Sequence, residues 1–175
     1  VRLCKEIHSI LLSGGRGSTK QPGELRKSQN WIGGTRPSNA MFVPPPAGEV
    51  PDALSELEKF IHDENQTTPP LLKAALAHVQ LETIHPFLDG HGRIGRLMIT
   101  LYLVNEGILE KPLLYLSEYF ETNKELSYDN LTRVRTHNNM LHWIKSFLVG
   151  IDKTASNAVR TLSSVIQLKK YVDSQ

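Results

Sequence analysis

The sequence predicts an all-α fold, on three observations. Apolar residues recur at spacings of three and four along most of the chain, and glycines and prolines separate these stretches. Only one short segment, residues 39–43, has strand character. It lies inside a polar stretch over residues 13–51 and is followed by three consecutive prolines. We therefore expect a helical domain that contains one short β segment.

The apolar spacing defines the individual helices. They are predicted over 3–11, 52–61, 71–84, 93–107, 117–135 and 139–149, with a last one from about residue 153. Those over 71–84 and 93–107 are apolar almost all round, which is typical of buried helices. Residues 1–150 are expected to form the domain. Residues 151–175 are either a closing core helix or a linker to a further domain.

Length and composition restrict the class of protein. The 175 residues suffice for one domain with a core. A formal net charge of +2 without a Lys/Arg block is too small to suggest a nucleic-acid surface on its own, so nucleic acid is expected only through a domain outside this chain. The longest apolar run, 97–104, is too short to span a bilayer. A single cysteine and no visible secretory leader favour a cytoplasmic protein.

The most informative segment is HPFLDGHGRIGR, residues 85–96, between the two buried helices. Gly90 and Gly92 have no side chains, so the backbone N–H groups of the turn before a helix can approach a ligand closely. A helix N-terminus favours an anion. Arg93 and Arg96 share a face of the first turns of the following helix, where positive side chains are disfavoured by the helix dipole. Bound phosphates would offset that unfavourable interaction.

Two further residues complete a set suited to phosphate chemistry. Asp89, just before the turn, is a hard oxygen ligand for the Mg²⁺ that accompanies phosphates. His85 belongs to the side-chain type that accepts a proton near neutral pH. The plainer interpretation is a glycine-rich interhelical turn beside a core histidine.

Two alternatives concern other segments. His62-Asp63, combined with His78, His85 and His91, could form the metal site of a phosphohydrolase. The polar stretch 13–51 could be a partly disordered insertion, but its large apolar side chains favour an ordered functional loop.

Residues 85–96 resemble the signature of the Fic family (Fic/Doc superfamily), H-x-F-x-[D/E]-G-N-G-R-x-x-R. The matching residues are His85, Phe87, Asp89, Gly90, Gly92, Arg93 and Arg96. Residues 22–34 and 40–46 resemble the family's β-hairpin flap, here within 13–51. Residues 113–120 and 131–136 resemble a bacterial subgroup that carries an N-terminal inhibitory helix. The resemblance implies a Fic-type helical domain.

The resemblance implies transfer of AMP from ATP, with Mg²⁺, to a Ser, Thr or Tyr hydroxyl of a target protein, with release of pyrophosphate. His85 would take the hydroxyl proton and Asp89 would hold Mg²⁺. The backbone around residues 90–92 would cradle the phosphates, with Arg93 on the β/γ end. Arg96 would bind the γ-phosphate or an inhibitory glutamate.

Other roles implied by the resemblance lie outside the signature. Ile32, Phe42 and Val43 of the flap would dock the target protein as an added strand. Tyr128 would lie near the adenine, and Phe87 would be buried and anchor the loop. An inhibitory helix, upstream or in trans, and a homodimer are further partners that the resemblance allows.

One position departs from the signature, because His91 replaces its asparagine. A Fic-like protein that binds nucleotide or a partner with impaired turnover is therefore an alternative. Transfer of another phosphate-containing group and removal of AMP are others. Gly92 stands where the related Doc-type kinases carry lysine, which favours AMP transfer. The family's inhibitory motif, [S/T]-x-x-x-E-[G/N], has no match; residues 117–122 come close but end in threonine.

Overall fold

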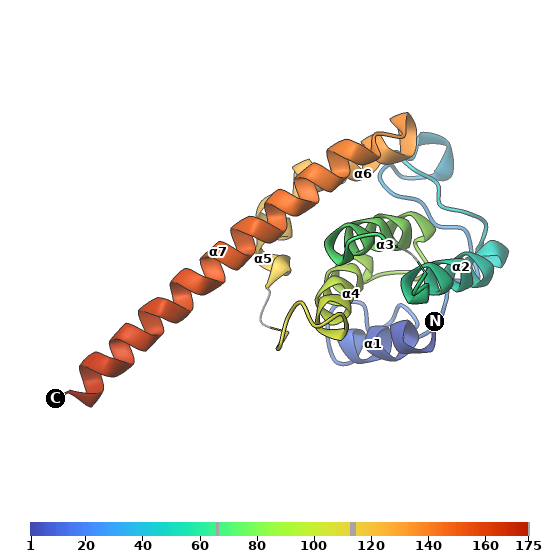
Figure 1. Ribbon diagram of the computed structural model, residues 1–175. Coiled ribbons are helices and arrows are strands. Elements are labelled where there is room, and N and C mark those ends of the chain that lie inside the picture. Colours follow the sequence, from blue (N-terminus) through green and yellow to red (C-terminus); the bar gives the residue numbers. More distant parts are fainter. Residues whose placement is uncertain (66, 113–114, 175) are drawn as a thin grey trace.

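The computed structural model describes residues 1–65, 67–112 and 115–174. Within them the chain is helical (Figure 1) and the prediction of an all-α fold is confirmed. The helices are α1 (Arg2–Leu12), η1 (Pro37–Asn39), η2 (Ala47–Glu49), α2 (Val50–His62), α3 (Pro70–Ile84), α4 (His91–Asn105), α5 (Leu116–Thr122), α6 (Lys124–His137) and α7 (Met140–Asp173). Leu113 and Leu114, which begin the segment 113–120 that resembles the bacterial subgroup, lie outside the described residues.

Helix α3 occupies the centre of the domain and packs against α2, α4 and α7. Its small residues Ala74 and Ala75 let neighbouring helices approach closely, and both are buried in the main core. That core also contains side chains from α4 to α7, namely Ile99, Leu103, Leu116, Phe120, Leu131, Trp143 and Phe147. The buried Trp143 indole donates a hydrogen bond to the carbonyl oxygen of Ala75 at 2.9 Å. The apolar character predicted for α3 therefore reflects burial on several sides.

Helices α3 and α4 meet closely at Gly95. A Cβ atom there would lie 2.6 Å from Glu82 Oε1 and 2.9 Å from the ring of His78. We expect Gly95→Ala to lower the free energy of unfolding by about 1–3 kcal/mol, because both neighbours are buried and have little room to move. Chemical denaturation measures this. Gly48→Ala is the matched control, since a Cβ there meets nothing within 4 Å; equal effects of the two would contradict the packing argument.

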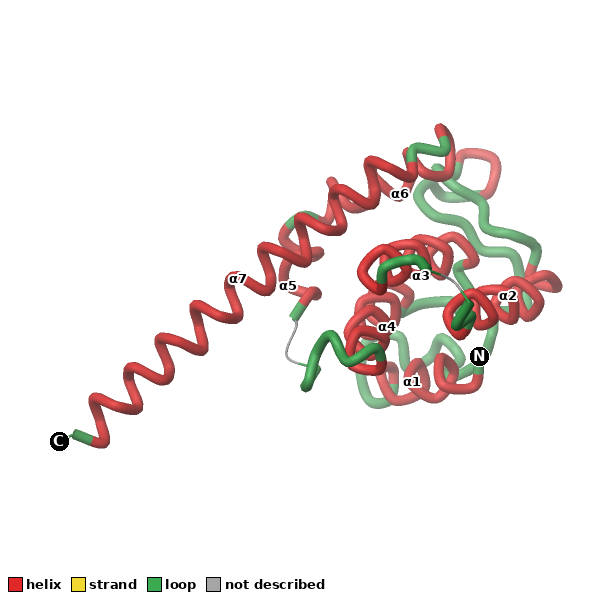
Figure 2. Tube along the Cα trace, viewed as in Figure 1, coloured by secondary structure: helices red, strands yellow, loops and turns green. Residues whose placement is uncertain are grey.

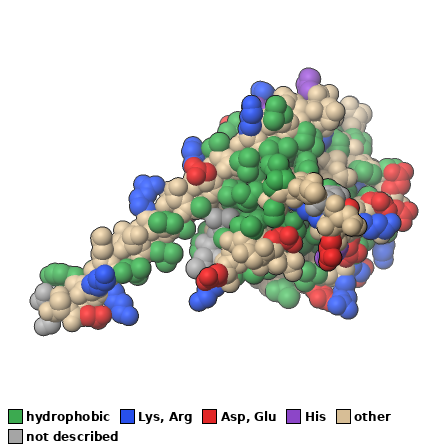
Figure 3. Space-filling model, viewed as in Figure 1, with side chains coloured by type: hydrophobic (Ala, Val, Ile, Leu, Met, Phe, Trp, Pro, Cys, Tyr) green, Lys and Arg blue, Asp and Glu red, His purple; other side chains and the backbone are tan. Residues whose placement is uncertain are grey.

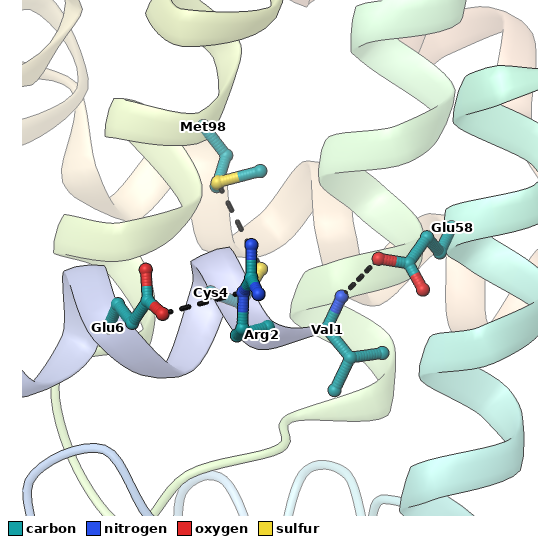
Figure 4. A network of polar contacts seen from close by, with 6 residues as sticks. All are labelled: Val1, Arg2, Cys4, Glu6, Glu58 and Met98. Carbon is teal, nitrogen blue, oxygen red and sulfur yellow. Dashed lines mark hydrogen bonds and ion pairs between the residues drawn. The ribbon is translucent and has the colours of Figure 1, made fainter.

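Helix α1 packs across α4 and extends toward α2 (Figure 4). The Cys4 thiol lies 4.0 Å from the Met98 sulfur, and the amino group of Val1 contacts the Glu58 carboxylate. On the solvent side Arg2 and Glu6 form an exposed ion pair at 3.5 Å. The buried contact with α4 orients α1, because an exposed pair of this kind stabilises little.

The flap is less regular than the predicted β-hairpin. Ile32 and Phe42 form a single antiparallel bridge, and no strand occurs among the described residues (Figure 2). Asn39, expected in the strand, belongs to η1. Prolines at 37 and 44–46 explain the short pairing, because proline has no N–H to donate to a β-ladder.

The helices after residue 115 also differ from the predicted ranges. The single helix expected over 117–135 is broken at Asn123, whose side chain donates to the carbonyl oxygen of Tyr119 at 2.8 Å. Conversely, α7 continues through residue 150, where two helices had been predicted. Gly150 stays helical because it lies against Tyr119, whose ring is 2.7 Å from where a Cβ would be. The expected domain boundary at 150/151 thus falls inside one helix.

No described helix combines the length and apolar character needed to cross a bilayer.

Candidate active site

His85 ends helix α3 in a left-handed backbone conformation, with φ 50° and ψ 59°. Such a conformation is strained for a residue with a Cβ and persists only where the surroundings hold it. Its N–H donates to Leu81, and its carbonyl oxygen accepts from Arg26 Nε at 2.9 Å. Burial lowers the pKa of His85 to about 4, so the imidazole is neutral at neutral pH. A neutral imidazole can accept a proton.

His91, the residue that departs from the signature, forms part of the framework under His85. The two rings stack with centroids 3.3 Å apart, and His91 is buried. His91 Nε2 accepts the N–H of Phe87 at 2.9 Å, so in the neutral ring Nδ1 carries the proton. Burial, together with the adjacent His85, holds the pKa of His91 well below its usual value. Both rings therefore stay neutral, which avoids like charges in contact.

Arg26, in the flap region, ties the flap to the end of α3. Its side chain is buried, and its guanidinium donates to the carbonyl oxygens of His85, Ser28, Ile84 and Pro45. Its backbone N–H donates to the carbonyl oxygen of Pro86 at 2.9 Å. This planar fork satisfies backbone acceptors from three segments at once. It thereby helps to hold the strained backbone of His85.

His8 performs a similar function from helix α1. Its Nδ1 accepts the N–H of Gly23 at 2.8 Å, so its Nε2 carries the proton and donates to the carbonyl oxygen of Asp89 at 3.0 Å. Its ring stacks on Phe87, with centroids 3.8 Å apart. Phe87 is fully buried, as the family resemblance implied. The sequence around His8 gave no signal for this role, because its partners Gly23, Phe87 and Asp89 lie far along the chain.

Asp89 and Gly90 form the turn into helix α4. Gly90 is the N-cap with φ 82°, a conformation that glycine adopts without strain. The Asp89 carboxylate accepts the N–H of Gly90 at 2.6 Å. The loop after α1 closes over this carboxylate, since a Cβ at Gly17 would lie 3.0 Å from Asp89 Oδ2. The backbone N–H groups at the start of α4 lack partners within the helix and are suited to an anion.

The two arginines of the signature lie on α4 but contact different elements. Arg93 donates to the carbonyl oxygens of Arg16 at 2.9 Å and Leu11 at 3.4 Å. Arg96 pairs with Glu121 at 3.0 Å and donates to Ser117 Oγ at 3.2 Å. A Cβ at Gly92 would lie 3.0 Å from Arg96 Nη1, so glycine leaves room for this guanidinium.

Ser117 and Glu121 belong to the segment 117–122 that nearly matches the inhibitory motif. The structure brings both side chains to Arg96, although the segment ends in threonine. Glu121 therefore neutralises the arginine that was expected to bind the γ-phosphate or an inhibitory glutamate. The sequence signal for this contact is the spacing of Ser117 and Glu121, one helical turn apart.

Most of the predicted site residues line one cavity of about 510 Å³. From the predicted set it includes His85, Asp89, Gly90, His91, Gly92, Arg93, Arg96, Tyr128 and Ile32. Three further cations that sequence reasoning did not assign also line it: Arg16, Lys124 and Arg135. Tyr128 is half exposed, with the ammonium of Lys124 5.8 Å from its ring centroid. This concentration of positive charge suits a polyphosphate.

Arg135 connects the flap to the end of α3. Its guanidinium lies 4.3 Å from the ring centroid of Phe42 and donates to the carbonyl oxygen of Glu82 at 2.8 Å. Ile32 donates its N–H to Phe42 at 2.9 Å, so both flap residues are held close to the cavity. Of the three predicted docking residues only Ile32 lines the cavity; Phe42 and Val43 do not, and Val43 is exposed. Arg135 lies in the segment 131–136 that resembles the bacterial subgroup, but its contacts with Phe42 and Glu82 follow only from the tertiary structure.

Two buried titratable groups form one wall of the same cavity. Burial raises the pKa of Glu82 to about 7 and lowers the pKa of His78 to about 4. The His78 ring stacks near Trp143, with centroids 5.6 Å apart. His78 is thus a core residue beside the site.

The alternative metal site is not assembled. Residues 1–65, 67–112 and 115–174 contain no group of three or more His, Cys, Asp or Glu side chains placed to hold a metal ion. His62 instead borders a second cavity of about 420 Å³ among α1 to α4, whose lining is mostly apolar and contains no arginine or lysine. The arginines and the signature residues therefore belong to one cavity, the one beside His85.

The fold and the site define a helical domain in which a glycine-rich turn and two arginines line a cavity at a helix N-terminus. Residues 1–103 match the family model described as Fic/DOC family, and the chain belongs to this family. A solved Fic family protein from Desulfovibrio desulfuricans G20 superposes with a TM-score of 0.73 at 26% identity, over 90% of this chain and 46% of that one.

Curated relatives are named protein adenylyltransferase Fic. The proteins from Drosophila yakuba, Drosophila melanogaster and Drosophila erecta are 35%, 34% and 36% identical to this chain over 103 residues. In each case the match covers 58% of this chain and 19% of the relative. This chain thus matches about a fifth of the length of these relatives.

Proposed function

We propose that this chain is a protein adenylyltransferase, which transfers AMP from ATP to a Ser, Thr or Tyr hydroxyl of a target protein and releases pyrophosphate. The observation that carries the proposal is the neutral His85 imidazole held beside the glycine turn and the two arginines of α4. That arrangement puts a proton acceptor next to an anion site, as nucleophilic attack on a phosphate requires. The name of the curated relatives supports the same activity.

In this reaction His85 accepts the proton of the target hydroxyl as its oxygen attacks the α-phosphorus of ATP. The bond between the α-phosphorus and the bridging oxygen to the β-phosphate breaks, and pyrophosphate leaves. Bound phosphates add negative charge near the ring and raise the pKa of His85 above the value of about 4 that burial produces. Nucleotide binding thereby makes His85 a stronger base.

The phosphates are held by groups from both sides of the cavity. The N–H groups around Gly90, His91 and Gly92 face the α- and β-phosphates, and Arg93 binds the β/γ end. Arg96 binds the γ-phosphate after its ion pair with Glu121 has opened. Tyr128, at the rim, lies beside the adenine.

Asp89 is the residue that would hold Mg²⁺. Magnesium keeps several waters and binds through one or two carboxylates together with substrate phosphates, so a single half-buried carboxylate beside an anion site fits it. Bound Mg²⁺ supplies positive charge that offsets the charge developing on the leaving phosphates.

The target protein docks on the flap. The pairing of Ile32 with Phe42 provides a short extended backbone edge, and the exposed Val43 extends it. The reaction takes place in the cytoplasm, where ATP is available and the free, buried Cys4 stays reduced. An inhibitory helix, upstream or in trans, restrains it.

Intact-mass spectrometry of the 175-residue chain after incubation with ATP and Mg²⁺ tests the activity, with the chain as its own acceptor. The expected result is a mass gain of one AMP. A gain of one phosphate would establish a kinase instead. If no gain appears with this acceptor or with a peptide array of hydroxyl-bearing sequences, adenylyl transfer is wrong for this chain.

His91 separates adenylyl transfer from the alternative of a nucleotide-binding protein with impaired turnover. His91→Asn restores the signature residue but removes the ring stacked under His85. For an active natural site we expect a rate within about tenfold of the original chain, since asparagine can still accept the Phe87 N–H. Initial rates of AMP incorporation measure this. A gain of 100-fold or more, well above about tenfold, would establish the impaired-turnover alternative.

Glu121 competes with the γ-phosphate for Arg96. We expect Glu121→Gln to tighten ATP binding by about threefold to tenfold, because the pair is partly exposed and removal of one carboxylate frees one guanidinium. Isothermal titration calorimetry measures the dissociation constant. Glu118→Gln removes an equal charge from the same helix at an exposed position that lines the groove facing α7. Equal changes in both variants would point to net charge in place of the pairing.

A further inference from the structure

The contacts that attach the flap to the helices change along its length. Arg26 and Asn30 fix its first part through hydrogen bonds to the backbone at the end of α3 and in the loop that follows. Farther along, no hydrogen bond or ion pair among the described residues joins residues 31–43 to the helices. There the guanidinium of Arg135, on α6, lies 4.3 Å from the ring centroid of Phe42.

The contact between Arg135 and Phe42 is a favourable cation–π pair. A guanidinium within about 6 Å of the ring centroid is attracted to the face of the ring. Burial lowers the pKa of Arg135, but arginine stays charged in proteins, and removal of water from the charge strengthens its attraction to the ring. Arg135 therefore holds Phe42 and, through the antiparallel bridge, Ile32.

The same guanidinium is bound to the last turn of α3. Its Nη2 donates to the carbonyl oxygen of Glu82 at 2.8 Å, and its Nε lies 3.5 Å from Thr83 Oγ1. Glu82 is three residues before His85, which ends α3. Because residues of one helical turn are joined by backbone hydrogen bonds, Arg135 fixes the flap bridge relative to His85.

The part of the flap that Arg135 holds borders the candidate active site. Trp31, Ile32 and Gly33 line the same cavity as His85 and Arg135. A target segment docked on this part of the flap presents its hydroxyl at a position that the bridge sets. Precision matters there, since a misplacement of about 1 Å can reduce a rate by about 10²-fold.

We propose that Arg135 is a positioning residue for the acceptor, which holds the flap bridge relative to His85 so that the target hydroxyl reaches the imidazole. It acts through Phe42 on one side and through the last turn of α3 on the other. The proposal rests on the proposed adenylyl transfer. It gives a function to the segment 131–136, which lies outside the signature.

Binding a phosphate is the alternative role for Arg135, because this residue lines the nucleotide cavity. Its contacts favour positioning. Nη2 and Nε are directed at α3, and the face of the guanidinium is covered by Phe42. An arginine that binds a phosphate offers its fork of N–H groups to the anion, as Arg93 and Arg96 are placed to do at the start of α4.

Amide hydrogen exchange, followed by NMR on the 175-residue chain, tests the hold on the flap without any reaction. The N–H groups of Ile32 and Met41 donate within the bridge. Arg135→Met should speed their exchange by about threefold to thirtyfold, the range that corresponds to loss of one cation–π contact. Phe42→Leu should act similarly, and the double variant should stay within about twofold of the faster single variant, because both remove one contact.

Two exposed arginines control for the loss of a positive charge. Arg133→Met removes one from the same helix. Arg160→Met removes one from the part of α7 that projects from the body, where Figure 3 shows Lys and Arg side chains. Both should leave the exchange rates within about twofold of the original chain, and circular dichroism checks that every variant is folded. Equal acceleration in Arg133→Met and Arg135→Met would overturn the contact.

The role in transfer is measured with the peptide that gives the highest rate in the array of hydroxyl-bearing sequences. Arg135→Met should lower kcat/KM for this peptide by about threefold to tenfold, chiefly through KM, and change the dissociation constant for ATP by less than about threefold. Arg135→Lys keeps a charge near the ring but loses the planar fork, so it should recover part of the loss. A loss of ATP affinity of about tenfold or more would make Arg135 a phosphate ligand and overturn the positioning role.

Failure of this proposal is distinguishable from failure of adenylyl transfer. If the original chain transfers AMP and Arg135→Met does so with an unchanged KM for the peptide, the positioning role alone is wrong. If the original chain modifies no acceptor, the proposed function is wrong and the acceptor role falls with it. The exchange rates of the Ile32 and Met41 amides decide in either case whether Arg135 holds the flap.

Discussion

His85→Ala is expected to reduce AMP incorporation by about 10²- to 10⁴-fold, the usual contribution of a positioned general base. The reduction should fall on the rate of transfer, because alanine removes the proton acceptor but leaves the glycine turn and both arginines of α4. Intact-mass spectrometry with ATP and Mg²⁺ gives the rate, and calorimetry gives ATP affinity. We expect the dissociation constant for ATP to change by less than about threefold, since the imidazole does not bind the phosphates.

The pH dependence gives an independent check on the same residue. The pKa of free His85 is lowered to about 4, so its base form is present above that pH and is lost as the pH falls through it. The value of kcat/KM should therefore decline only on the acid side, with a midpoint near pH 4 provided that the fold persists, as circular dichroism would verify. His142→Ala, an exposed histidine on α7, should leave the rate unchanged. A His85→Ala variant with undiminished transfer would remove His85 from the mechanism.

Arg26→Met is expected to lower the free energy of unfolding by about 3–5 kcal/mol. Methionine fills much of the volume but leaves the part-buried carbonyl oxygens of Ser28 and Pro45 and the buried one of Ile84 without the guanidinium that they accept from. The carbonyl oxygen of His85 would keep only the longer contact, 3.4 Å, from Asn30. Urea denaturation followed by circular dichroism measures the change.

Two further variants show whether the hydrogen-bonding fork is responsible. Lys27→Met removes a neighbouring exposed cation and should change stability by less than about 0.5 kcal/mol. Arg26→Lys keeps the charge but loses the planar fork, so it should fall between the original chain and Arg26→Met. Stability of Arg26→Met within about 0.5 kcal/mol of the original would contradict the argument.

Local pattern was sufficient for the helical fold and for much of the candidate site. Helices α3 and α4 follow from apolar periodicity, and the turn between them follows from closely spaced glycines. The residues from His85 to Arg96 lie in one short segment, so their proximity required no knowledge of distant contacts. The flap was located correctly, but its regularity was overestimated, because the flanking prolines limit pairing to one bridge.

What the sequence determined by itself is therefore the all-α class and the grouping of His85, the glycines and the two arginines in one turn and helix start, since both depend on neighbours along the chain. Tertiary structure alone decided which distant residues serve that motif. His8 reaches Asp89 across 81 positions, and Arg26 reaches the His85 carbonyl across 59. Glu121 and Arg135 likewise belong to α5 and α6, two helices that follow the motif in the sequence. Such contacts depend on how helices pack in three dimensions. The spacing of residues within one segment cannot predict that packing.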